Sequence, residues 1–111
     1  MCTYHTLYHN DMNGYVIRCN DCENIQIGFG NLMLTVTEVE FDSLRTLLKV
    51  ILEDHNTNEI RETVRHIVIP TPCEGMKLLL SYRELRSFDQ MLEEADTELQ
   101  SSSLINLFTT S

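Results

Sequence analysis

The sequence predicts an α+β fold: an antiparallel sheet of about five strands built from two ββα units, with two amphipathic helices packed on one face. Residues 25–36 have the pattern of a hairpin, and residues 64–80 form a second β-rich stretch. Each stretch is followed by a helix-capping signal and an amphipathic run. The order strand, turn, strand, helix therefore occurs twice, which favours two related units. Chance similarity of two short amphipathic segments is the alternative.

The size and composition of the chain are typical of one folded domain. It has 111 residues, of which 42% are hydrophobic and 23% are charged. We therefore expect residues 1–111 to form a single domain. No apolar run approaches the roughly 20 residues that span a bilayer, and the polar start of the chain does not resemble a signal peptide. These features predict a cytoplasmic protein with no membrane partner.

Residues 1–36 are expected to contain an N-terminal Cys/His segment followed by a β-meander. Residues 1–13 have no clean period, so they form either a short strand or a loop. Gly30 and Asn31 are a two-residue hairpin signal because both tolerate positive φ. This turn fixes a register in which every apolar pair falls on one face of the sheet. The expected pairs are Phe29 with Leu32, Ile27 with Leu34, and Ile25 with Val36.

Two helices are expected, at residues 37–54 and 81–100. Each opens with a capping box, Thr37 with Glu40 in the first and Ser81 with Glu84 in the second. Apolar residues recur at spacings of three and four along one face of each helix. The positions that correspond in the two units are Leu34 and Leu78, Phe41 and Leu85, Leu44 and Phe88, and Leu48 and Leu92.

Residues 101–111 are expected to form a tail, because three consecutive serines interrupt the helical pattern. The tail contains four large apolar residues and either docks on the core or stays exposed. An exposed tail or an uncovered sheet face favours self-association. The expected partner is therefore a second copy of the chain or an unknown protein. The four apolar residues are Leu104, Ile105, Leu107 and Phe108.

The N-terminal third contains a candidate metal site. Cys2 and His5 are spaced like Cys19 and Cys22, and together they offer three thiolates and one imidazole. This set suits tetrahedral Zn(II) in a structural site with no open position for chemistry. Such a zinc ion supplies roughly 10 kcal/mol or more of folding free energy in a small domain. His9 is an alternative ligand to His5.

Two other interpretations of the cysteines remain open, plain reduced thiols and a redox pair made of Cys19 and Cys22. A redox pair is less favoured because thioredoxin-type pairs open a helix, whereas here a strand follows and Asp21 and Glu23 disfavour a thiolate. Glu23 also weakens the zinc interpretation, because zinc knuckles usually place Gly after the second cysteine to reach positive φ. Cys73 lies far away in sequence and is expected to be a semi-buried bystander thiol.

No catalytic residue set is evident in the sequence. There is neither a Gly-x-Ser-x-Gly motif nor a Gly-rich phosphate loop, so an enzyme is less favoured than a binding domain. The net charge is −9, with 17 acidic against 8 basic residues, and the basic residues are scattered among acids. Because phosphate binding needs clustered Lys and Arg, nucleic acid is not an expected partner, and a zinc-ribbon nucleic-acid reader is disfavoured.

A block of short motifs marks the first third of the chain. It consists of Gly14-Tyr15-Val16, Cys19-x-x-Cys22, Ile25-Gln26 and Phe29-Gly30-Asn31. With the Cys-x-x-His near the start, it resembles a family of short uncharacterised bacterial proteins, a domain of unknown function carrying a GYVxxCxxCxxIQxxFG block. The resemblance implies a small standalone domain with no assigned activity. It favours treating the four Cys and His residues as one group.

The sequence as a whole favours a small cytoplasmic binding or adaptor domain with a structural zinc site. The alternative is a thiol redox protein or enzyme that uses Cys19 and Cys22.

Overall fold

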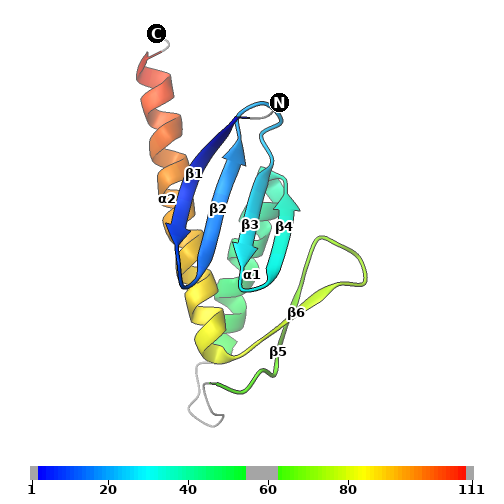
Figure 1. Ribbon diagram of the computed structural model, residues 1–111. Helices are drawn as coiled ribbons and strands as arrows, with labels where there is room; N and C mark the ends of the chain where they lie inside the picture. Colours follow the sequence, from blue (N-terminus) through cyan, green and yellow to red (C-terminus); the bar gives the residue numbers. More distant parts are fainter. Residues whose placement is uncertain (1–2, 55–62, 110–111) are drawn as a thin grey trace.

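The computed structural model describes residues 3–54 and 63–109, and within them it shows an α+β fold (Figure 1). A four-stranded antiparallel sheet, a separate two-stranded hairpin and two helices make up this part of the chain. The predicted fold class is therefore confirmed. The elements are β1 (Tyr4–Asn10), β2 (Gly14–Cys19), β3 (Ile25–Phe29), β4 (Leu32–Val36), α1 (Glu38–Asp54), β5 (Ile67–Pro70), β6 (Lys77–Leu80) and α2 (Tyr82–Thr109).

The four-stranded sheet is a meander in which β1, β2, β3 and β4 lie in chain order. The register of β3 and β4 is the predicted one. Phe29 lies opposite Leu32, and the other two predicted pairs, Ile27 with Leu34 and Ile25 with Val36, also lie opposite each other. β1 forms where the sequence showed no clean period. Its register shifts between Thr6 and Tyr8, which leaves Leu7 as a bulge residue. The bulge breaks the alternation of buried and exposed side chains along β1. The sequence of this strand therefore lacks the period of two that indicates a β-strand.

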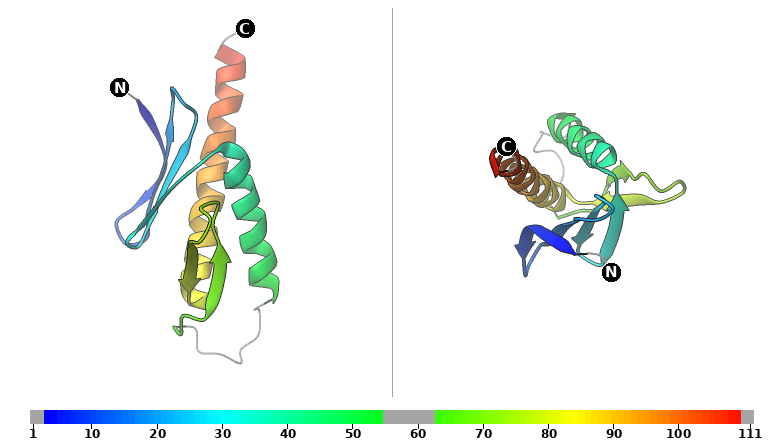
Figure 2. Two further views of the ribbon diagram at one scale, coloured as in Figure 1. Left: turned by 90° about the vertical axis from the view of Figure 1, so that its right-hand side faces the viewer. Right: turned by 90° about the horizontal axis from the view of Figure 1, so that it is seen from above.

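Both helices cover the same face of the four-stranded sheet, as predicted (Figures 1 and 2). They run antiparallel to each other, and their seams fill the core with Phe41 and Leu48 of α1 and Phe88 of α2. The ring of Phe88 stacks on Phe29 of β3 with centroids 4.7 Å apart. This aromatic contact ties α2 to the sheet.

The hairpin of β5 and β6 does not join the four-stranded sheet, so the expected single sheet of about five strands is replaced by separate sheets of four and two strands. The side chains on the inner face of the β5–β6 hairpin are buried in the core, whereas Val68 and Leu79 on its outer face are exposed. The apolar pattern had shown which face of the hairpin is buried. It carries no information about which strand edges pair. The buried residues of the hairpin are Ile67, Ile69, Leu78 and Leu80.

The two ββα units are built alike. In α1 the amide of Thr37 donates to Glu40 Oε1 at 2.9 Å and the amide of Glu40 donates to Thr37 Oγ1 at 3.1 Å. In α2 the amides of Ser81 and Glu84 make the same two bonds with each other's side chains, also at 2.9 and 3.1 Å. Both predicted capping boxes are therefore confirmed. All of the predicted corresponding positions are buried: Leu34 and Leu78, Phe41 and Leu85, Leu44 and Phe88, Leu48 and Leu92.

Helix α2 is longer than the sequence suggested. It continues through Ser101, Ser102 and Ser103 to Thr109, so the expected end near residue 100 and the separate tail are wrong. Serine is only mildly unfavourable inside a helix, and neither Gly nor Pro follows to stop it. The last part of α2 projects past the end of the sheet (Figures 1 and 2). Neither α1 nor α2, as far as the chain is described, has the length and apolarity needed to cross a membrane.

Candidate functional site

The two cysteines of the central motif lie on a tight turn between β2 and β3. The amide of Glu23 donates to the Cys19 carbonyl at 3.0 Å, and the amide of Cys22 donates to the Sγ of Cys19 at 3.3 Å. Cys19 is 3% exposed, whereas Cys22 is exposed. A hydrogen bond to sulfur favours its charged form, and the thiolate is the form that binds metal. The turn therefore brings a backbone amide to the sulfur of its first cysteine.

Glu23 has a φ of 65°, in the left-handed region. This conformation was not predictable from the residue type, because Glu rarely adopts it. The left-handed backbone costs a non-glycine residue roughly 1–2 kcal/mol. Glu23 thus adopts the positive φ for which the sequence analysis had expected a glycine to be needed. The presence of Glu at this position is no longer an objection to a knuckle.

Thr3 attaches the N-terminal strand to this turn. The Asn20 amide donates to the Thr3 carbonyl at 2.8 Å, and the Thr3 amide donates to Asp21 Oδ2 at 3.0 Å. The Asn20 side chain adds a third bond, to Thr3 Oγ1 at 3.2 Å. Cys2 lies outside the described residues, but it is bonded directly to Thr3.

The two candidate histidine ligands are placed differently. His5 pairs with Arg18, and its Nε2 lies 3.1 Å from Glu98 Oε1 and 3.3 Å from Ser102 Oγ, both on α2. Its ring is therefore turned towards α2. His9 pairs with Tyr15, which lies four residues before Cys19 on β2. At 3.3 Å per residue, Tyr15 and Cys19 are about 13 Å apart along the strand. The fold brings His5, but not His9, to the end of the sheet where the knuckle lies.

The ligand set cannot be completed from the described residues. Within 3–54 and 63–109, no group of three or more His, Cys, Asp or Glu side chains could hold a metal ion. Cys19 and Cys22 do lie together on one turn. Cys73 is at a distance from them in the β5–β6 loop, and it is exposed rather than semi-buried. Strand β3 follows the knuckle, so no helix N-terminus activates these thiols as in thioredoxin-type pairs.

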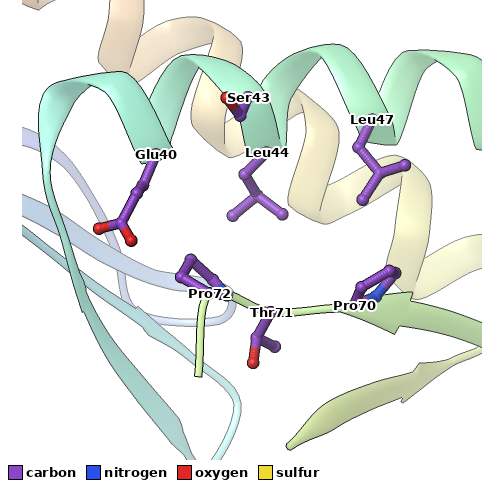
Figure 3. Close-up of a pocket in the computed structure, with 7 residues that line it drawn as sticks. All are labelled: Glu40, Ser43, Leu44, Leu47, Pro70, Thr71 and Pro72. Carbon is purple, nitrogen blue, oxygen red and sulfur yellow. The ribbon is translucent and has the colours of Figure 1, made fainter. Parts of the chain in front are cut away.

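A groove that the sequence analysis missed runs between α1 and the segment after β5 (Figure 3). Its volume is about 300 Å³, and its walls are mostly apolar. The Thr71 hydroxyl donates to the carbonyl of Met76 at 2.7 Å and so fixes the loop that forms one wall. The residues that line the groove are Glu40, Ser43, Leu44, Leu47, Pro70, Thr71 and Pro72.

The groove continues along the outer side of α1. A second hollow shares Ser43 and Leu47 with the first and extends to Val39, Thr46 and Val50. Val39 is 76% exposed and Val50 is 50% exposed. We call this continuous surface the α1 groove. Two valines outside the core seam of an amphipathic helix were the sequence signal that could have revealed it.

Acidic side chains dominate the border of the α1 groove. Glu40 lines the groove, and Asp42 borders its extension. The two basic residues of α1 are directed to α2 instead: Arg45 contacts Glu93 at 3.0 Å, and Lys49 contacts Asp89 at 3.1 Å. Arg45 also contacts Asp42 at 3.3 Å and so partly compensates this border carboxylate, and the remaining negative charge of the border comes mainly from Glu40.

The face of the sheet opposite the helices, called here the outer sheet face, carries no Asp, Glu, Lys or Arg side chain in the paired positions. The ring of Tyr15 lies directly on Gly28, where an added Cβ would overlap it. Met33 is exposed at the edge strand β4. The two full rows of this face are Thr6, Ile17, Gln26 and Thr35, and His9, Tyr15, Gly28 and Met33.

One contact in the described part of the chain superficially resembles a catalytic triad. Ser102 Oγ and Glu98 Oε1 both approach the same nitrogen of His5, its Nε2, at 3.3 and 3.1 Å. A triad needs the serine and the carboxylate on different ring nitrogens, so that one orients the imidazole and the other exchanges a proton with it. This arrangement lacks that geometry and instead ties β1 to α2.

Comparison with known proteins gives a family but no activity. No curated protein and no solved structure matches the chain. The model of the Family of unknown function (DUF6686) matches residues 1–109, nearly the whole chain. The chain therefore belongs to this family of unknown function, DUF6686.

Proposed function

We propose that this protein is a non-enzymatic binding or adaptor domain of the cytoplasm that holds a segment of a partner protein in the α1 groove. The observation that carries the proposal is the groove itself. Leu47, Val39 and Val50 present apolar surface along one helix, and Pro70 and Pro72 form a wall opposite its first part (Figure 3). Exposed apolar grooves with a polar border are typical of protein-binding sites.

The chemistry of the groove selects its partner. Its volume of about 300 Å³ is enough for a large apolar side chain such as Leu or Phe. The acidic border formed by Glu40 and Asp42 favours Lys or Arg on either side of that anchor and repels acidic segments. The proposed occupant is therefore a short protein segment with an apolar anchor flanked by basic residues.

Selection from a random peptide library displayed on phage tests the proposal. We expect enriched peptides to share an apolar anchor with basic flanks. Ser43→Trp would fill the groove from its exposed border and abolish binding of these peptides, measured by calorimetry. Thr97→Trp, at an exposed position of α2, is the matched control and should retain binding. Absence of any enriched motif, or equal binding by both variants, would overturn the proposal.

We also propose that a structural Zn(II) ion fastens the N-terminal end of this domain. Cys19 and Cys22 supply two thiolates, and Cys2 and His5 supply the other ligands. Zinc binding by His5 requires its ring to turn away from the contacts of its Nε2 with Glu98 and Ser102 on α2. The support comes from the amide-to-sulfur bond in the knuckle, from the φ of 65° at Glu23, and from the attachment of Thr3 to the same turn. Bound zinc would supply folding free energy and no chemistry, because four protein ligands leave no open position.

Elemental analysis of protein purified without chelators tests the zinc proposal. We expect one zinc per chain, lost in Cys22→Ser and retained in Cys73→Ser, together with a large fall in thermal stability on chelation. Loss of zinc in His5→Ala but not in His9→Ala would assign the fourth ligand. Protein without zinc whose stability is unaffected by chelators would refute the site. Fast alkylation of Cys22 in such protein would point to redox use instead.

A further inference from the structure

A second pocket lies where the β5–β6 hairpin stays apart from the four-stranded sheet. It is bounded by the turn between β3 and β4, at Gly30 and Asn31, and by all four residues of β6 (Figure 1). Arg65 and Glu84 also line it, and it shares no residue with the α1 groove. We call it the hairpin pocket. Its volume of about 330 Å³ is within the range of sites that hold small molecules.

The apolar side chains of the hairpin pocket are fixed by the core. Phe29 lines the pocket from β3, and its ring stacks on Phe88 of α2 with centroids 4.7 Å apart. Leu78 and Leu80 line it from β6, and both are buried. Because the core holds these side chains in place, the pocket is formed before a ligand arrives. Binding there requires little ordering of side chains, which lowers its entropic cost.

Lys77 gives the hairpin pocket a cation without a counter-ion. Elsewhere in the chain, Arg18, Arg45 and Lys49 each contact a carboxylate. No carboxylate in the described part of the chain pairs with Lys77, although the whole sequence has 17 acidic residues against 8 basic ones. The ammonium of Lys77 is therefore available to an anion that enters the pocket.

The other two charged side chains of the pocket balance each other. Nε and Nη2 of Arg65 donate to the Glu84 carboxylate at 3.0 and 2.9 Å, and the Ser81 amide donates to the same carboxylate at 2.9 Å. The charge of Glu84 is thus compensated within the protein, and Nη1 of Arg65 has no partner among the described residues. Two basic and one acidic side chain line the pocket, so its net charge is +1.

We propose that the hairpin pocket binds a carboxylate that is attached to a short apolar group. The carboxylate contacts Lys77 and the side-chain amide of Asn31, which has no hydrogen-bond partner in the described part of the chain. The apolar group lies against Phe29 and Leu78. A monoanion matches the pocket charge of +1, whereas the net charge of −9 on the whole chain repels a more highly charged phosphate.

This selection is opposite to that of the α1 groove, whose acidic border favours basic segments. The two sites are therefore independent, and a variant that fills one should leave the other intact. Both a free small acid and the C-terminus of a peptide carry a carboxylate next to an apolar group, so the experiment includes one probe of each kind.

Heteronuclear NMR of the isotope-labelled full chain, titrated with hexanoate from about 0.1 to about 30 mM, tests the proposal, because ligands of this size bind in the millimolar range. We expect saturable shifts of the amide signals of Gly30, Asn31 and β6. Hexanamide has the same shape without the charge and should bind about fivefold more weakly, a modest factor because exposed ion pairs are weak.

Variants separate the charge of Lys77 from the shape of the pocket. Lys77→Gln should weaken hexanoate binding by about the same factor of five, whereas Lys77→Arg should retain it. Ser43→Trp, which fills the α1 groove, is the matched control and should bind hexanoate as the wild type does. The spectrum of each variant without ligand shows whether it is folded.

The peptide acetyl-Ala-Ala-Leu with a free C-terminal carboxylate distinguishes the two sources of the ligand. Binding at least tenfold tighter than that of hexanoate would assign the pocket to a protein C-terminus, and any weaker binding would assign it to a free small acid. Three results would overturn the inference. They are the absence of saturable shifts with both probes, equal binding of hexanoate and hexanamide, and unchanged binding of hexanoate by Lys77→Gln.

Discussion

Arg45 of α1 reaches across the helix pair to Glu93 of α2, with 3.0 Å between Nη2 and Oε1. The same guanidinium contacts Asp96 on α2 at 3.2 Å and Asp42 on its own helix at 3.3 Å. The side chain is only 21% exposed, so it lies partly in the layer between the helices. In a chain of net charge −9, one arginine thus offsets three carboxylates at the helix contact.

We predict that Arg45→Leu lowers the free energy of unfolding by about 1–3 kcal/mol, because Asp42 and Asp96 lose this cation and Glu93 keeps only its contact with Lys49 at 3.3 Å. The loss should be largest at low salt, where screening is weakest. Urea denaturation measures it. A double-mutant cycle with Glu93→Gln should show coupling between the two sites. Lys77→Leu removes the same charge from an exposed strand position and should change stability by less than about 0.5 kcal/mol.

We predict that Gly14→Ala is strongly destabilising. Gly14 has a φ of +139°, and an added Cβ would overlap the carbonyl oxygen of Gly28 on the neighbouring strand. That oxygen belongs to the backbone of β3 and cannot move without disturbing the sheet. We expect a loss of more than about 2 kcal/mol in urea denaturation.

Gly30→Ala is the control for Gly14→Ala. Gly30 also has a positive φ, +60°, but open space surrounds its missing Cβ. Only the backbone penalty of about 1 kcal/mol is expected there. Equal losses in the two variants would show that the overlap with Gly28 does not matter.

Features set by residues close together in sequence were predictable. The hairpin register follows from the turn at Gly30 and Asn31, and each capping box depends on two residues three positions apart, such as Thr37 and Glu40. The cysteine turn was located for the same reason, since Cys19 and Cys22 lie within it. In each of these cases the chemistry of a few neighbouring residues decides the geometry.

Features that depend on distant contacts were not predictable from the pattern. The bulge at Leu7 conceals β1, and nothing local shows that the β5–β6 hairpin stays apart from the larger sheet. The α1 groove needs Pro70 and Pro72 next to α1, and the orientation of His5 depends on Glu98, 93 residues away. Sequence periodicity reports which face of an element is buried, but it does not report which element covers it.

We predict that Glu23→Gly stabilises the protein. At a φ of 65° glycine avoids the clash that Glu suffers, while the side chain contributes only an exposed contact with Arg18 at 3.7 Å. The greater freedom of glycine in the unfolded chain offsets part of this gain. The net expectation is an increase of about 0.5–1 kcal/mol in the free energy of unfolding.

Thermal unfolding with and without chelator measures the effect of Glu23→Gly, which should be present in both conditions because it arises from the backbone. Glu74→Gly is the control, because Glu74 is also exposed but has no positive φ, and it should lower stability. A lower melting temperature for Glu23→Gly would show that the left-handed conformation is not a source of strain.

We predict an acid-dependent loss of stability that comes from Glu84. Arg65 donates to both carboxylate oxygens of Glu84, at 3.0 and 2.9 Å, and this pairing lowers the pKa of Glu84 in the folded state, with partial burial opposing it. Because the folded-state pKa lies below the unfolded value of about 4.5, the contribution is fully present above that pH and is lost as pH falls through the folded-state pKa.

Urea denaturation of Glu84→Gln between neutral pH and about pH 2.5 measures this contribution. The variant should be less stable than the wild type at neutral pH, and the difference should shrink as Glu84 becomes protonated in the wild type. Glu74→Gln, in the exposed β5–β6 loop, is the matched control and should follow the wild type throughout. Because Glu84 also closes the capping box with Ser81, Arg65→Gln separates the two roles. Arg65→Gln should reduce the pH dependence of the free energy of unfolding while leaving the capping box of Ser81 and Glu84 in place. An unchanged pH dependence in this variant would show that Arg65 is not the cause of the lowered pKa of Glu84.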